Sequence, residues 1–60
     1  MISFSDYYGN EIYINICDIS YIEKCNEDYS YVHVSNGSTI KIMTEVFDLL
    51  KQRIKEYYEN

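Results

Sequence analysis

The stretch YSYVHVSNGSTIKIM, residues 29–43, alternates apolar and polar residues on both sides of its Asn-Gly pair. Such alternation is typical of two antiparallel strands with one buried face, and Asn-Gly is a common hairpin turn. A two-residue loop would mix apolar and polar residues on each face, whereas a three-residue loop, Ser35-Asn36-Gly37, separates them. We therefore predict strands over Tyr29–Ser35 and Ser38–Met43, with Val32 opposite Ile40 and Gly37 in a left-handed conformation.

Two shorter alternating runs, Met1–Tyr7 and Glu11–Cys17, precede this hairpin and flank Tyr8-Gly9-Asn10. The same three-residue rule places the loop at Tyr8-Gly9-Asn10. Phe4 would then pair with Ile14, and Ile2 with Ile16. A second hairpin in this register is the prediction for the first part of the chain.

The alternation slips after Ile16, because the next apolar residues, Ile19 and Ile22, are three positions apart. This spacing predicts a bulge or corner at Cys17-Asp18-Ile19 and a third short strand over Ser20–Cys25. The polar segment 26–28 that follows has the composition of a loop.

From Thr44 the period becomes helical, since apolar residues recur every three or four positions: Val46, Phe47, Leu50, Ile54 and Tyr57, flanked by Leu49 and Tyr58. Thr44 is the expected N-cap, with Glu45 at the positive end of the helix dipole. The prediction is a single α+β domain over residues 1–60. Its four to five antiparallel strands form a meander, and one C-terminal helix packs on one face of it.

These registers assign the strand residues to two faces. The face covered by the helix carries Ile2, Phe4, Ile12, Ile14, Ile16, Val32, Val34, Ile40 and Ile42. The opposite face carries Ser3, Ser5, Tyr13, Asn15, Tyr31, His33, Thr39 and Lys41, and nothing in the chain remains to cover it. Four more tyrosines, Tyr7, Tyr8, Tyr21 and Tyr29, fall at turns or strand ends nearby.

Eight tyrosines in 60 residues favour a contact surface, because tyrosine combines a large rigid ring with a hydroxyl group. The candidate partner-binding residues are Tyr7, Tyr8, Tyr13, Tyr21, Tyr29, Tyr31, His33 and Lys41. Under the alternative interpretation they are ordinary strand residues, since tyrosine also favours β-structure.

The charge balance narrows the classes of partner. Ten acidic residues against five basic ones leave a net charge of −5. A protein that binds nucleic-acid phosphates or an anionic membrane surface needs a basic patch instead. We therefore expect a protein partner or a second copy of the chain in a homodimer. The acidic residues form solvated surface, or alternatively a patch that mimics phosphate and blocks a basic groove.

The sequence predicts neither a metal site nor an enzyme. Cys17, Cys25 and His33 match no zinc-ligand spacing, and no acid–base or nucleophile pair emerges. No cofactor is expected. The first residues, MISFSDYY, lack the charged and apolar segments of a signal peptide, so we expect a cytoplasmic protein with reduced cysteines.

Two families share motifs with this chain. The run Ile12–Ile14, then Asp18–Glu23, then Tyr31–Gly37 resembles the first half of a LytTR-type DNA-binding domain. The later strands and basic loops of that domain have no counterpart here, so DNA binding is carried over to no residue. The layout of Gly9, Glu11, Asn15, Ile19, Ile22, Glu23 and Gly37 before a terminal helix is similar to small FlbD-like flagellar and swarming proteins. These proteins have a Pro-Asp-Thr segment where this chain has residues 25–29.

The expected function is that of a small non-enzymatic regulator or inhibitor that acts by protein contact. Absence of Ala and Pro and abundance of Ile, Tyr, Asn and Lys are typical of AT-rich codons, which suggests a low-GC bacterium or its phage. A phage protein of this kind would block a host enzyme, including a defence nuclease. The alternatives are a LytTR- or FlbD-like regulatory module and a small-ligand or nucleotide sponge, in which tyrosines stack on a base near Lys41.

Overall fold

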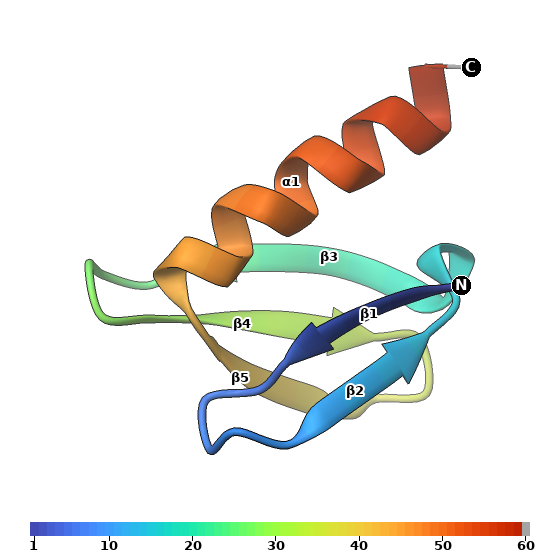
Figure 1. The fold of residues 1–60 in the computed structure, drawn as a ribbon. Coiled ribbons are helices and arrows are strands. Elements are labelled where there is room, and N and C mark those ends of the chain that lie inside the picture. Colours follow the sequence, from blue (N-terminus) through green and yellow to red (C-terminus); the bar gives the residue numbers. More distant parts are fainter. Residues whose placement is uncertain (60) are drawn as a thin grey trace.

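The computed structural model describes residues 1–59, in which five antiparallel strands precede one helix (Figure 1). The strands are β1 (Ile2–Ser5), β2 (Glu11–Ile14), β3 (Ile19–Lys24), β4 (Tyr29–Val34) and β5 (Thr39–Met43). The helix is α1 (Thr44–Glu59), and a 3₁₀ turn over Ile16–Asp18 joins β2 to β3. The predicted α+β class with a C-terminal helix is confirmed.

The strands divide into two sheets, where the sequence predicts one continuous face. β1 pairs with β2 as a hairpin, and β3, β4 and β5 form a three-stranded sheet with β4 in the centre. The 3₁₀ turn redirects the chain at the predicted corner, and the Ser35 amide fixes it by donating to the Asp18 carbonyl at 2.8 Å. The hairpin crosses in front of the three-stranded sheet in Figure 1 and lies beside α1.

The β4–β5 hairpin has the predicted register, with Val32 opposite Ile40, Tyr31 opposite Lys41 and His33 opposite Thr39. Gly37 has a φ of +94°, the left-handed conformation that the three-residue loop requires. The Val34 amide closes this loop by donating to the Ser38 carbonyl at 2.9 Å.

The predicted β1–β2 register is wrong by two residues: Ile2 lies opposite Ile14 rather than Ile16, and Phe4 opposite Ile12 rather than Ile14. Gly9, with a φ of +87°, takes the last position of the loop, so the loop is 7–9 and not 8–10. A shift of two residues keeps every side chain on its predicted face.

The Asp6 carboxylate determines this loop position. Its Oδ1 accepts hydrogen bonds from the Tyr8 amide at 2.9 Å and the Asn10 amide at 2.8 Å. The Asn10 side-chain amide donates to Oδ2 at 3.0 Å, and this bond is the main cause that lowers the pKa of Asp6. An aspartate at the start of a turn commonly bonds in this way.

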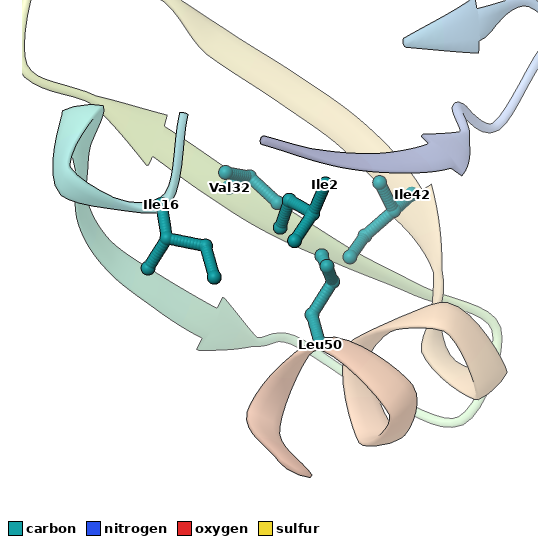
Figure 2. Packing of buried hydrophobic residues seen from close by; sticks show 5 residues of the cluster. All are labelled: Ile2, Ile16, Val32, Ile42 and Leu50. Carbon is teal, nitrogen blue, oxygen red and sulfur yellow. The ribbon is translucent and has the colours of Figure 1, made fainter. Parts of the chain in front are cut away.

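One core lies between the three-stranded sheet on one side and the hairpin and helix on the other (Figure 2). Its buried members come from almost every element: Ile2, Ile16, Val32, Ile42 and Leu50. Other predicted inward residues, among them Phe4, Ile14, Val34 and Ile40, pack around them. The hairpin thus supplies part of the cover that the sequence analysis assigned to the helix alone.

Helix α1 begins at Thr44, but the Thr44 side chain does not have the predicted capping role. Its hydroxyl donates to the Asn26 carbonyl at 2.6 Å and lies 3.0 Å from the Ser30 hydroxyl. Glu45 does occupy the first turn. The helix packs through Leu50, with Phe47 and Ile54 partly buried against the core.

Candidate functional site

The outer face of the three-stranded sheet carries a connected group of aromatic side chains. β4 turns Tyr29, Tyr31 and His33 outward, because Ser30 and Val32 between them point inward and are fully buried. β3 adds Tyr21 opposite His33, and β5 adds Lys41 opposite Tyr31. Together with two tyrosines of the β1–β2 turn they form what we call the aromatic face: Tyr7, Tyr8, Tyr21, Tyr29, Tyr31, His33 and Lys41.

His33 lies at the centre of the stacked part of this face. Its ring is 4.1 Å from that of Tyr21, with only 13° between the two planes, and 6.4 Å from that of Tyr31. Tyr31 in turn meets Tyr29 edge to face at 5.7 Å. Rings that pack on one another in these geometries are held in defined orientations before any partner arrives.

Glu23 fixes the histidine from its other end, and the sequence analysis did not place it among the candidates. Its Oε1 lies 2.9 Å from His33 Nε2, a hydrogen bond that becomes an ion pair when the imidazole is protonated. Glu23 lies opposite Tyr31 on the adjacent strand, two residues from Tyr21. The two-residue spacing of Tyr21 and Glu23, which puts both on one side of β3, is the signal that could have identified it.

Lys41 joins the stacked rings to the β1–β2 turn. Its Nζ lies 4.2 Å from the centre of the Tyr7 ring and 4.6 Å from that of Tyr29, distances at which a cation and an aromatic face attract. The Tyr7 amide also donates to the Lys41 carbonyl at 2.8 Å. The turn is therefore attached to the edge of β5 through both backbone and side chains.

Tyr13 does not belong to this face. The sequence pattern places it beside Tyr31 and His33 on neighbouring strands, but β2 is part of the other sheet. Tyr13 points away from the core on the hairpin, where its hydroxyl donates to Glu11 Oε1 at 2.7 Å. That bond raises the pKa of the Tyr13 phenol. All the other predicted candidates are brought together.

A shallow depression of about 490 Å³ lies beside Lys41 and Tyr31. It is lined by Asp6, Tyr8, Ile12, Tyr31, Thr39, Ile40 and Lys41. The Asp6 carboxylate, whose lowered pKa keeps it ionised, would repel a phosphate group placed next to Lys41. This arrangement disfavours the nucleotide-sponge alternative and suits a neutral or cationic contact.

The two cysteines are exposed free thiols. Partial desolvation, and then the nearby Glu23 carboxylate, raise the pKa of Cys25. Among residues 1–59, no three side chains of the His, Cys, Asp and Glu types gather in a way that could hold a metal ion.

No known protein family, no curated protein and no solved structure matches this chain. The helix described here is neither long nor apolar enough to cross a membrane.

Proposed function

We propose that this protein is a non-enzymatic regulator or inhibitor that acts in the cytoplasm by binding another protein through its aromatic face. The observation that carries the proposal is the connected stack Tyr21–His33–Tyr31–Tyr29 on an uncovered sheet face. Rings that already support one another lose little conformational freedom on binding, so more of the contact energy remains for affinity.

The charge of the chain indicates the chemistry of the partner. The net charge is −5, and the one lysine of the face is engaged with tyrosine rings. A partner with an apolar centre and a basic rim would complement such a surface. The substrate groove of a nuclease is basic, and this charge complementarity supports the specific proposal of a phage-encoded inhibitor of a host enzyme.

Self-association through the same face is the other form of this proposal. An isologous pair would stack the tyrosines of two copies about a twofold axis, and small domains commonly gain stability in this way. Sedimentation equilibrium of the free protein distinguishes a homodimer from a monomer that reserves the face for a foreign partner.

Tyr21 and Tyr13 provide a matched test, because they are 58% and 62% exposed and lie on different sheets. A photo-crosslinking phenylalanine derivative at position 21 should capture a protein from a low-GC bacterial lysate, or a second copy of the chain. The same derivative at position 13 should capture much less. Tyr21→Ser should weaken affinity for the captured protein about tenfold, and Tyr13→Ser should leave it unchanged.

Equal crosslinking from both positions, or equal affinities of both variants, would refute a contact through the aromatic face. Salt-dependent binding of duplex DNA would instead favour a LytTR-like module. Saturable binding of a mononucleotide that Lys41→Ala abolishes would favour the sponge.

A further inference from the structure

A groove of about 540 Å³ runs between β3 and the C-terminal half of α1. Its aliphatic lining residues are Ile16, Ile19, Ile22 and Ile54. Ser20 and Tyr21 of β3 and Lys51, Lys55 and Tyr58 of α1 complete the lining. Figure 1 shows the last turns of α1 rising clear of the strands. The helix therefore leaves this part of the apolar surface of β3 open.

The groove borders a free strand edge. The Val34 amide donates to the Ser38 carbonyl. Because the backbone groups of successive residues in an antiparallel ladder point alternately to the two neighbouring strands, those of Val32 and Ser30 also point to β5. The backbone groups of Tyr31 and His33 point to β3. Their partners on β3 are Glu23 and Tyr21. Ile22 lies between Tyr21 and Glu23 on β3, and Lys24 follows Glu23. The backbone amide and carbonyl groups of Ile22 and Lys24 therefore point away from β4, toward the free edge.

The two edges of the sheet differ in this respect. At β5 the Tyr7 amide donates to the Lys41 carbonyl, so the β1–β2 turn covers the edge. β3 is the opposite edge, and within residues 1–59 it pairs with β4 alone. A free edge beside an apolar groove is the arrangement in which domains bind an extended peptide as an added strand.

The charge around the groove is opposite to that of the whole chain. Lys51 and Lys55 lie one helical turn apart on its rim, and both are exposed. Lys24 lies on the same side of β3 as Ile22, opposite buried Ser30, and is exposed too. In a chain of net charge −5, the charged residues that line the groove are both lysines, Lys51 and Lys55, and this local positive charge favours an acidic ligand.

We propose that this groove binds an extended acidic segment of another protein, which adds to β3 as a further antiparallel or parallel strand. The backbone of the segment bonds to Ile22 and Lys24. Its alternate aliphatic side chains contact Ile19, Ile22 and Ile54, and its flanking carboxylates pair with Lys51 and Lys55. Tyr21 lines this groove and also belongs to the aromatic face, so the two surfaces adjoin at β3, whereas Lys51 and Lys55 belong to the groove alone.

A synthetic peptide tests the proposal directly. The probe is acetyl-Glu-Glu-Ile-Thr-Val-Thr-Ile-Glu-Glu-amide with a fluorescent label, titrated by anisotropy at low salt. We expect saturable binding that weakens as salt is added, because charge pairs at the rim are screened. Hydrogen exchange of the Ile22 and Lys24 amides should slow in the complex.

Lys55→Glu and Arg53→Glu form the matched pair, as each reverses one exposed positive charge on the same helix. Arg53 borders a different depression, between β1 and α1. Lys55→Glu should weaken binding about tenfold, and Arg53→Glu should change it by less than about twofold. A peptide N-methylated at every internal residue, which has no amide left to donate to a strand edge, should not bind.

Several results would overturn the proposal. They are the absence of saturable binding, equal losses for Lys55→Glu and Arg53→Glu, and undiminished binding of the N-methylated peptide. If the free protein sediments as a dimer with the Ile22 amide already protected, the edge belongs to a second copy. Circular dichroism of both variants shows that a loss of binding does not come from unfolding.

Discussion

The Thr44 hydroxyl connects three segments of the chain through one oxygen atom. It donates to the Asn26 carbonyl before β4 and pairs with Ser30 within β4, while its own backbone starts α1. Ser30 and Thr44 are the buried polar residues of the structure described here. The pair is satisfied internally, as buried polar groups generally must be.

Thr44→Val should therefore destabilise the protein by about 1–3 kcal/mol, because it leaves the Ser30 hydroxyl and the Asn26 carbonyl without this partner. Urea unfolding followed by circular dichroism measures the effect. Thr39→Val, at an exposed position of β5, is the control and should change stability by less than about 0.5 kcal/mol. Ser30→Ala should lower the free energy of unfolding less in the Thr44→Val variant than in the unaltered protein, because the two hydroxyls are paired. Losses that simply add in the double variant would contradict this pairing.

Gly37 can be replaced by L-alanine or by D-alanine, and these two variants differ only in the chirality of one residue. A side chain at this position meets nothing within 4 Å, so a substitution changes backbone strain and not packing. At a φ of +94° Gly37→Ala should cost roughly 1–2 kcal/mol. The D-alanine counterpart, accessible by chemical synthesis, should instead stabilise by about 0.4–1 kcal/mol, since it restricts the unfolded chain. Equal thermal midpoints for the two forms would contradict the left-handed loop.

At the scale of elements, the helix depends on one side chain at its centre. Leu50 is 3% exposed and lies against Ile2, Val32 and Ile42 (Figure 2), whereas the adjacent Leu49 is 68% exposed. This difference between neighbours follows from the helical period that the sequence already displays.

Leu50→Ala should cost on the order of 2–5 kcal/mol, a large share of the total stability of so small a domain. Leu49→Ala is the matched control and should have little effect on the thermal midpoint. Similar melting curves for both variants would mean that α1 does not pack through Leu50.

The sequence predicted the elements better than their arrangement, for physical reasons. Alternation shows which residues of a strand face a core, so Val32 and Ile42 were placed correctly. It does not show which sheet a strand joins, and Tyr13 was therefore assigned to the wrong surface. The β1–β2 register differs from the prediction because the Asp6 hydrogen bonds fix the turn so that Gly9 takes the last loop position and not the middle one.

The groove at β3 was missed although its pattern is present in the sequence. Lys51, Ile54, Lys55 and Tyr58 continue the three- and four-residue spacing of α1, and of these only Ile54 packs against the core. A helix face that continues beyond the strands it packs on is a signal of an open groove. The free edge of β3, in contrast, follows only from the strand order.

For the whole molecule, the two sheets should unfold together because they share one core. Ile2→Ala removes buried contacts on the hairpin and should cost about 2–5 kcal/mol. When unfolding of this variant is followed by NMR signals of the β1–β2 hairpin and, separately, of β4, both melting temperatures should fall by the same amount. Separate transitions, with the hairpin melting first, would show that it is an appendage to the three-stranded sheet.

The position of Lys41 has a practical consequence for attaching this protein to a solid support. Lys41 is half-buried and its amine lies against the Tyr7 and Tyr29 rings, whereas Lys24, Lys51 and Lys55 are exposed. Amine-reactive esters will therefore couple at the exposed lysines first, and two of these, Lys51 and Lys55, line the groove. A biosensor chip prepared in this way presents the tyrosines to solution but obstructs the β3 edge. Partner screens on such a chip report on one surface, and peptide titrations need the untethered protein.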